Sequence, residues 1–491
     1  MISSKEIHQH FNQFREGVIG FDHSFIGPFG EKKIIYADWV ASGRLYRPIE
    51  LKMLNDIGPF VANTHTESTF TGKFMTDAYH QARANIKKYV GANSEDVIIP
   101  CGSGMTGALA KLQRILGFKL PEQLIPHLSI PPELRPVVFI THMEHHSNQT
   151  SWMETLCEVV IIPPDESGLP DLVAFEELIV KYRHKEIKIA SITACSNVTG
   201  VICPYRKLAS IIHRYGGLCF VDFACSAPYV KIDMHPEESG EHLDAIFFSP
   251  HKFLGGPGTP GILIFTKNLY HNKIPDIPGG GTVKWTNPWG NHAYIDSIED
   301  REDGGTPAFL QTIKASLAMD LKEELDPTKM HIREREIFNR LFSEFGGNKK
   351  MIILAENIQN RIAAFSFFIE GLHYNLGVSL LNDLFGIQTR GGCSCAGTYG
   401  HYLFHIEKEI SESICYLIDH GDHSQKPGWI RLSVHPIMDE VDVDNIVEGI
   451  HYVLKNHQKY SRDYMYNPIE NNFTHRAQDK YKITEPVHLA L

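Results

Sequence analysis

The chain has 491 residues, which is longer than one compact domain usually runs and is enough to bury a large core. Its 47 lysines and arginines against 58 aspartates and glutamates give a formal net charge of −11 with neutral histidines. The sequence therefore lacks the global basic field that attracts nucleic acid or an anionic membrane surface. We expect a small-molecule or protein partner, and neither nucleic acid nor membrane.

The amino-terminal sequence MISSKEIHQHFNQF has no apolar core behind a basic end, and no uninterrupted apolar stretch is long enough to span a bilayer. Nine cysteines are scattered along the chain, mostly inside apolar runs, as at Cys195, Cys203 and Cys219. This distribution favours buried thiols in a reducing compartment over a disulfide framework. We therefore predict a soluble protein of the cytoplasm.

Apolar, β-branched runs alternate with helical segments from residue 33 to residue 267. We predict strands at 97–102, 137–142, 159–164, 187–194, 218–223 and 244–249. This alternation is typical of an α/β domain with a mostly parallel sheet sandwiched by helices. Its chemistry is expected at the carboxyl ends of the strands.

The pattern changes after a predicted helix at 306–321. Charged helices such as 332–345 are interleaved with predicted strands at 362–370 and 428–434, which indicates a smaller α+β domain. From Lys459 the chain is polar and weakly patterned, so we predict an arm or loosely ordered tail. The predicted domains are residues 36–305 for the large α/β domain, 1–35 with 306–458 for the small domain, and 459–491 for the tail.

Lys252 lies between two apolar runs in the stretch FSPHKFLGGPGTPGILIF. A lysine in such a place is either a surface amine or a nucleophile. Asp222 lies at the end of the predicted strand 218–223, one strand before the predicted strand 244–249 that leads to Lys252, and an acid there is costly unless it faces a cation. Adjacent strands would deliver both groups to the same sheet edge. Pyridoxal phosphate catalysis needs such a pair, because a lysine forms the Schiff base and an acid keeps the pyridine nitrogen protonated. The alternative is a salt bridge.

A glycine-rich loop follows the first predicted strand. Gly102, Ser103 and Gly104 precede an amphipathic helix, so backbone N–H groups and the helix dipole could hold a phosphate there. The loop has neither the lysine of a Walker loop nor the dinucleotide fingerprint.

Two further predicted strands are followed by polar residues. His145 and His146 follow one of them, and either could stack on a cofactor ring or act as an acid or base. A zinc site is the alternative, but no cysteine or histidine pair elsewhere completes a ligand set, so we expect no metal. Asn197 follows another strand, where the alternative role is that of a simple turn residue.

The segments MEHHSN, SNVTG, VDFACS with SPHKFLGGPGTPG, and GGTP follow one another in this order. In this set and order, the chain resembles the class V branch of fold type I pyridoxal phosphate enzymes, particularly the cysteine desulfurase and selenocysteine lyase group, from about residue 38 to about residue 453. The resemblance implies the cofactor pyridoxal 5'-phosphate. It assigns Lys252 to the Schiff base and to proton transfer, Asp222 to the pyridinium nitrogen, His145 to stacking on the ring, and Asn197 to the ring oxygen and substrate. It assigns phosphate binding to Gly102, Ser103, Gly104, Ser249 and His251.

Thr306 in GGTP matches the residue that members of this family offer to the phosphate of the neighbouring subunit. The resemblance therefore implies a homodimer with shared active sites. The alternative is that residues 304–307 only form a turn and a helix start.

The second half of the chain carries the residues that bear on the reaction. Arg431 and Arg390 could bind the carboxylate of a small amino-acid substrate, although Arg390 could instead form a loop salt bridge. Cys395 lies five residues after Arg390, the offset at which desulfurases carry their nucleophile. The resemblance thus implies cleavage of L-cysteine to L-alanine with a persulfide on Cys395. Cys393 could be a partner, a relay or a bystander.

The chain departs from the family pattern at several positions. Cys225 stands where the desulfurases usually have a glutamine, Gly104 and Met105 replace more polar residues, and GGCSC differs from the usual cysteine loop. Selenocysteine remains an alternative substrate, and the sequence does not identify the sulfur-acceptor protein that the resemblance implies. The chain could instead be a class V aminotransferase, another lyase or an epimerase with Cys395 incidental, or a scaffold without cofactor.

Overall fold

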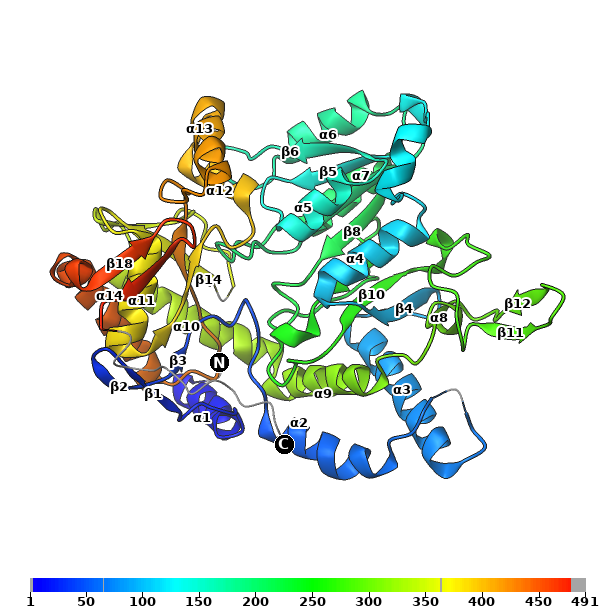
Figure 1. The fold of residues 1–491 in the computed structure, drawn as a ribbon, viewed down its shortest axis with the longest axis horizontal. Helices are drawn as coiled ribbons and strands as arrows, with labels where there is room; N and C mark the ends of the chain where they lie inside the picture. Colours follow the sequence, from blue (N-terminus) through cyan, green and yellow to red (C-terminus); the bar gives the residue numbers. More distant parts are fainter. Residues whose placement is uncertain (1–2, 65, 363, 478–491) are drawn as a thin grey trace. The chain divides into compact units, whose positions relative to one another are not determined.

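The computed structural model describes residues 3–64, 66–362 and 364–477, and the chain divides into two compact units (Figure 1). The large unit comprises Ser42–Ser196 and Ile202–Pro327, and the small unit comprises Met1–Ala41, Asn197–Val201 and Thr328–Leu491. The domain limits predicted from the sequence stay a prediction. None of the helices within the described ranges combines the length and apolar character that a membrane span needs.

The large unit is built on a seven-stranded sheet in the order β4-β10-β9-β8-β7-β5-β6. Strands β5 to β9 pair in parallel, and β10 runs antiparallel to both β4 and β9. The strands are β4 (Asp96–Cys101), β5 (Val137–Thr141), β6 (Glu158–Ile162), β7 (Lys188–Thr193), β8 (Leu218–Asp222), β9 (Ala245–Phe248) and β10 (Gly261–Thr266). The six predicted strands all form, and the predicted α/β fold with a mostly parallel sheet is confirmed.

Helices cover this sheet, and its central strands are buried on both faces. Every residue of β5 and β7 is buried, as is typical of parallel strands with helices on either side. The helices are α2 (Arg47–Lys52), α3 (Phe70–Tyr89), α4 (Gly104–Ile115), α5 (His146–Met153), α6 (Leu172–Lys181), α7 (Tyr205–Arg214), α8 (Ile298–Arg301) and α9 (Phe309–Leu325). A hairpin of β11 (Val283–Thr286) and β12 (His292–Tyr294) projects from this unit (Figure 1).

The small unit contains a four-stranded antiparallel sheet in the order β13-β14-β17-β16. These strands are β13 (Met351–Ile353), β14 (Ala364–Ile369), β16 (Arg390–Gly392) and β17 (Trp429–Ser433). Residue 363 of the predicted strand 362–370 lies outside the described residues. The helices are α1 (Ser4–Arg15), α10 (Pro327–Phe345), α11 (Tyr374–Phe385), α12 (Gly397–Phe404), α13 (Lys408–Asp419) and α14 (Glu440–Tyr460). Short pairs are β1 (Ser24–Gly27) with β2 (Gly30–Lys33), and β3 (Ile35–Tyr36) with β15 (Ile387–Gln388).

The segment Asn197–Val201 belongs to the small unit although it follows β7 in the chain. Gly200 accepts a hydrogen bond from Ile362 N–H at 2.8 Å. A Cβ on Gly200 would lie 2.0 Å from the Ile362 carbonyl oxygen, and its φ is +71°. Only glycine fits this close backbone approach, which fixes the position of Asn197 three residues earlier.

The stretch after Lys459, which we expected to be an arm or tail, contains a hairpin of β18 (Tyr464–Asn467) and β19 (Asn472–His475). The buried Tyr464 hydroxyl donates a hydrogen bond to Asp383 Oδ2 at 2.6 Å, so this hairpin packs on α11. Residues 478–491 of the predicted tail lie outside the described residues.

Candidate active site

Asp222 and Lys252 follow neighbouring parallel strands of the large unit. Asp222 is the last residue of β8, which pairs with β9, and Lys252 lies in the short turn Pro250–Lys252 after β9. The Asp222 carboxylate is buried and accepts a hydrogen bond from Ala224 N–H at 2.7 Å. Burial raises the pKa of Asp222 to about 6, and the positive charge of Lys252 acts in the opposite direction. A buried carboxylate of this kind is stabilised in its charged form by a cation.

The glycine-rich loop meets the turn after β9 at the amino-terminal end of α4. The Ser249 hydroxyl accepts a hydrogen bond from Met105 N–H at 2.8 Å. A Cβ on Gly104, whose φ is +60°, would lie 2.7 Å from Ser249 Oγ and 3.6 Å from His251 Nε2. Burial, and then the charge of Lys252, lowers the pKa of His251 to about 4, so the imidazole is neutral. The exposed Ser103 makes no side-chain cap to α4.

His145 caps the amino-terminal end of α5. Its Nδ1 accepts a hydrogen bond from Ser147 N–H at 3.0 Å, so a neutral His145 carries its proton on Nε2. The adjacent Glu144 is fully buried, and desolvation raises its pKa to about 7. Sequence reasoning assigned no role to Glu144, although it directly precedes His145.

Glu144 connects three elements through hydrogen bonds. Its Oε1 accepts from Thr141 N–H at 3.2 Å, Thr141 Oγ1 at 2.6 Å and Thr193 N–H at 2.9 Å, and its Oε2 accepts from Asn148 Nδ2 at 2.7 Å. These partners lie on β5, β7 and α5, so Glu144 sets where the helix that begins after His145 leaves the sheet.

Arg431 lies on β17 with only 3% of its side chain exposed. Its Nη1 donates to the Asn197 carbonyl at 3.1 Å, and its Nη2 donates to Asp38 Oδ1 at 2.7 Å. Arg390 Nε donates to the other oxygen of the same carboxylate at 3.0 Å. Arg390 therefore forms a salt bridge, which is the alternative that the sequence left open for it. The sequence did not indicate its partner, Asp38.

Two buried polar atoms beside these contacts have no hydrogen-bond partner within the described residues: Arg431 Nε and Asn197 Oδ1. Such orphans are costly in a protein interior unless a ligand or water satisfies them. One is a cationic donor and the other is an acceptor, so together they suit a small ligand that carries a carboxylate and an amine.

The loop that carries Cys395 begins directly after β16. Its Ser394 carbonyl accepts a hydrogen bond from Asn197 Nδ2 at 2.7 Å, and Ala396 N–H donates to the Cys393 carbonyl at 3.0 Å. Ser394 and Cys395 have φ angles of +51° and +57°, which non-glycine residues adopt at an energetic cost. The side chain of Cys395 is exposed and that of Cys393 is half-buried.

The described contacts thus join the predicted residues into two groups, one in each unit. In the large unit, Gly104, Ser249 and His251 converge on one loop, and Asp222 interacts electrostatically with Lys252. In the small unit, Asn197 connects Arg431 with the Cys395 loop. Thr306 is exposed in the large unit, and the buried Cys225 donates its thiol proton to the Ser196 carbonyl at 3.7 Å.

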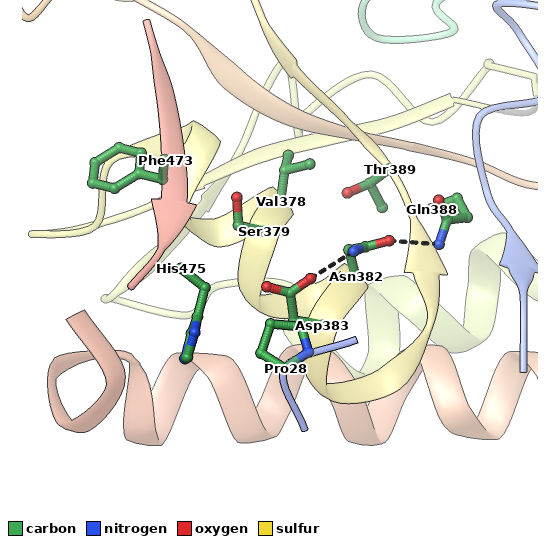
Figure 2. Close-up of a pocket in the computed structure, with 9 residues that line it drawn as sticks. All are labelled: Pro28, Val378, Ser379, Asn382, Asp383, Gln388, Thr389, Phe473 and His475. Carbon is green, nitrogen blue, oxygen red and sulfur yellow. Dashed lines mark hydrogen bonds between the residues drawn. The ribbon is translucent and has the colours of Figure 1, made fainter. Parts of the chain in front are cut away.

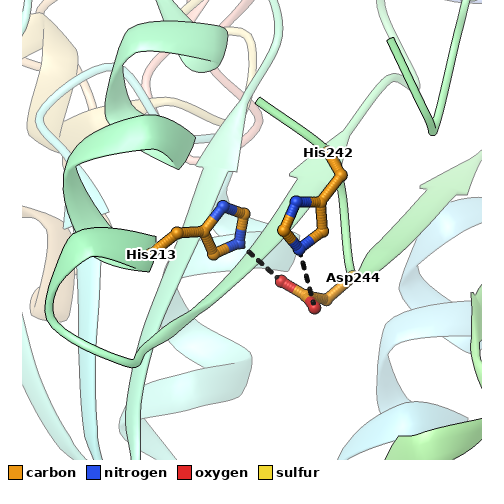
Figure 3. A group of neighbouring side chains, drawn as sticks. All are labelled: His213, His242 and Asp244. Carbon is orange, nitrogen blue, oxygen red and sulfur yellow. Dashed lines mark hydrogen bonds and ion pairs between the residues drawn. The ribbon is translucent and has the colours of Figure 1, made fainter. Parts of the chain in front are cut away.

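The structure also groups His213, His242 and Asp244 (Figure 3), a cluster with metal-ligating side chains that sequence reasoning missed. His213 Nδ1 contacts the Gly240 carbonyl at 2.6 Å, and its Nε2 lies 2.9 Å from Asp244 Oδ2. The two imidazoles stack at 4.0 Å with an interplanar angle of 6°. Parallel rings cannot both direct an in-plane lone pair at one ion, so this geometry is that of a His213–Asp244 ion pair.

A cavity of about 260 Å³ lies in the small unit beside α11 and β19 (Figure 2). Its polar side chains contact one another: Asn382 Nδ2 donates to Asp383 Oδ1 at 2.6 Å, and Gln388 Nε2 donates to Asn382 Oδ1 at 2.7 Å. None of the predicted site residues lines it, so it is not the candidate active site.

Comparison with known proteins identifies the family. The model of class V aminotransferases matches residues 35–446, most of the chain. The chain belongs to the class V aminotransferase family. Among its relatives, the probable cysteine desulfurase of Halalkalibacterium halodurans is 28% identical over 374 residues, which cover 74% of this chain and 84% of the relative. That of Staphylococcus epidermidis is 26% identical over 373 residues and covers 74% and 84%.

Solved structures share the fold of this class V aminotransferase family member. A cysteine desulfurase from Thermococcus onnurineus superposes with a TM-score of 0.69 at 20% identity, covering 86% of this chain and 95% of that one. The cysteine desulfurase CsdA from Escherichia coli gives a TM-score of 0.68 at 21% identity, covering 91% and 98%. The fold of the class is therefore established for nearly the whole chain.

Proposed function

We propose that this protein is a pyridoxal phosphate enzyme that cleaves L-cysteine to L-alanine and receives the sulfur on Cys395. The observation that carries the proposal is the Cys395 loop: an exposed thiol stands five residues after Arg390, and Asn197 hydrogen-bonds both the loop and Arg431. The names of the curated relatives, probable cysteine desulfurases, support the same reaction.

The residues of the large unit fit pyridoxal phosphate. The buried Asp222 with its raised pKa suits a pyridinium nitrogen, which would stabilise the carboxylate. Ser249 and His251 lie close to Gly104 at the amino-terminal end of α4, where the N-cap Ser103 makes no side-chain hydrogen bond to the helix, and this arrangement suits a phosphate. When bound, the cofactor supplies an electron sink for the substrate carbon. The residues that would hold it are Lys252, Asp222, His145, Ser249, His251, Gly102, Ser103 and Gly104.

Substrate binding and proton transfer fall to three side chains. The substrate carboxylate would accept from Arg431 Nε, which has no partner within the described residues, and Asn197 Oδ1 would accept from the substrate amine. Lys252 would carry the cofactor on its Nζ. As a free amine, the same Nζ would take the proton from the substrate α-carbon and later return a proton to the product.

Sulfur transfer falls to Cys395. Its thiolate would attack the substrate sulfur, so a sulfur–sulfur bond forms while the carbon–sulfur bond breaks and its electron pair stays on the carbon. Protonation of that carbon gives alanine, and the enzyme retains a persulfide. The left-handed backbone at Ser394 and Cys395 presents the thiol on an exposed turn, where a sulfur acceptor could reach it.

Alanine release from L-cysteine tests this function. We expect Cys395→Ser to abolish it, while Cys415→Ser, which alters another exposed cysteine, leaves it unchanged. An aminotransferase would instead yield the keto acid, and its rate would not depend on Cys395. If borohydride fails to fix a cofactor on Lys252, the protein is not a pyridoxal phosphate enzyme.

We further propose a homodimer with shared active sites in the cytoplasm. Thr306 is exposed and so is open to a neighbouring subunit, and Trp285 and Trp289 on the β11–β12 hairpin are 49% and 83% exposed. All nine cysteines are free thiols, which supports a reducing compartment. Sedimentation equilibrium tests the dimer, and a monomer at micromolar concentration would contradict it.

A further inference from the structure

Asp38 joins Arg390 and Arg431 in the small unit. Arg390 and Arg431 lie directly opposite each other in the antiparallel pair β16–β17. Residues in this register point to the same face of a sheet, and like charges there repel. The Asp38 carboxylate offsets the repulsion, because one oxygen accepts from Arg431 at 2.7 Å and the other from Arg390 at 3.0 Å.

The backbone holds Asp38 in place independently of the arginines. Asp38 forms a parallel bridge with Ser433 at the end of β17, and Ser433 N–H donates to the Ala37 carbonyl at 2.7 Å. The Val40 N–H in turn donates to Ser433 Oγ at 3.0 Å. The carboxylate is therefore a fixed part of the fold, with 13% of its side chain exposed.

The charges of this group do not cancel. Two guanidinium groups and one carboxylate leave one unit of positive charge beside Arg431, whose side chain is 3% exposed. The Arg390 side chain is 48% exposed, so solvent screens its charge, whereas the buried Arg431 lies in a low-dielectric environment, where a charge needs a partner. The orphaned Arg431 Nε is the donor left for that partner.

We propose that Asp38 is a positioning residue that sets the charge of the substrate site, so that the site takes an amino acid with one carboxylate and discriminates against one with two. This inference rests on the proposed function, which assigns Arg431 to the substrate carboxylate. By occupying Arg390 and one edge of Arg431, Asp38 uses the contacts that a second carboxylate would need.

Calorimetric titration of the holoenzyme with L-alanine and L-aspartate tests the proposal, because these ligands differ by one carboxylate. We expect the wild-type protein to bind L-aspartate more weakly. Asp38→Asn keeps the shape but removes the charge, so the ratio of the two dissociation constants should shift by about tenfold or more toward L-aspartate. Asp22→Asn, which alters an exposed carboxylate of the same unit, should leave the ratio unchanged.

A second substitution separates charge from general damage. In Asp38→Asn with Arg390→Ala, the ratio should return toward the wild-type value, because the freed guanidinium is gone. An unchanged ratio in Asp38→Asn, or equal weakening of both ligands, would overturn the proposal. If Asp38→Asn does not fold, L-alanine binding to Arg390→Ala tests the proposal instead. Its side chain is 48% exposed, and loss of the excess charge should weaken L-alanine binding by about tenfold, whereas unchanged binding would overturn the proposal.

These measurements distinguish the inference from the proposed function. If the wild-type protein releases alanine from L-cysteine but the ratio does not respond to Asp38→Asn, the inference alone is wrong. If Asp38→Asn changes the ratio of the two dissociation constants but the wild-type protein does not cleave L-cysteine, the proposed desulfurase reaction is wrong and the proposed role of Asp38 at the carboxylate site is supported. If the wild-type protein binds neither ligand, both are wrong.

Discussion

At Gly104 the backbone and a neighbouring hydroxyl together exclude a side chain. Its φ of +60° disfavours other residues, and a Cβ would lie 2.7 Å from Ser249 Oγ. Gly117, after the same helix, has a φ of +74° but nothing within 4 Å of a Cβ. A substitution at Gly117 therefore introduces backbone strain alone, whereas the same substitution at Gly104 also crowds the proposed phosphate site.

We predict that Gly104→Ala weakens the binding of pyridoxal phosphate by about tenfold or more, and that Gly117→Ala does not. Both variants should lose about 1 kcal/mol of stability from the strained backbone. Cofactor affinity is measured by titrating the cofactor-free protein, and stability by denaturant unfolding. Equal cofactor affinities in the two variants would show that the loop at 102–104 does not hold the phosphate.

The His213–Asp244 pair makes stability depend on pH. Burial lowers the pKa of His213, but the hydrogen bonds to Asp244 and Gly240 outweigh it and raise the pKa above its usual value. A raised folded-state pKa stabilises the fold fully below the unfolded value and loses this contribution as pH rises through the folded value.

His213→Gln should therefore destabilise the protein by about 1 kcal/mol near pH 6 and by less above pH 8. Thermal unfolding of the wild-type protein and of His213→Gln across this pH range measures the difference in their stability, with the exposed His184→Gln as the control. A stability difference that grows as the pH rises would contradict the ion pair.

At the scale of elements, Glu144 connects β5, β7 and α5 through four accepted hydrogen bonds. Its position just before His145 means that this connection also sets where the proposed ring-stacking histidine lies. Loss of the carboxylate would leave the buried donors of Thr141, Asn148 and Thr193 without their partner, which is costly in a protein interior.

We predict that Glu144→Ala lowers the free energy of unfolding by about 3 kcal/mol and reduces cofactor affinity as α5 shifts. The exposed Glu166→Ala should change neither quantity. Denaturant unfolding and cofactor titration check both effects. Unaltered stability in Glu144→Ala would mean that these hydrogen bonds do not position α5.

Sequence patterns predicted six strands of the large unit because each is a short, mostly apolar run. The Asp222 and Lys252 positions followed from the same pattern, since both come directly after such runs. Contacts between distant segments were not predictable. Asp38 and Arg390 are separated by 352 positions, and neither local periodicity nor composition indicates that these two residues form an ion pair. The hairpin at Tyr464–His475 was missed because polar residues interrupt its aromatic ones and because its packing on α11 depends on Asp383.

At the scale of the whole molecule, the fold of the class V aminotransferase family is combined with a loop that carries the exposed Cys395. Membership of the family leaves the reaction open, because one fold supports several chemistries. The reaction depends on where the substrate sulfur goes, and Cys395 is the residue to which we assign it.

A single turnover with L-cysteine radiolabelled in its sulfur tests that assignment most directly. After alkylation and non-reducing digestion, the label should be found on the peptide that contains Cys395, in equal amount to the alanine released. Alanine release with the label on Cys415, or on no protein thiol, would contradict the assignment.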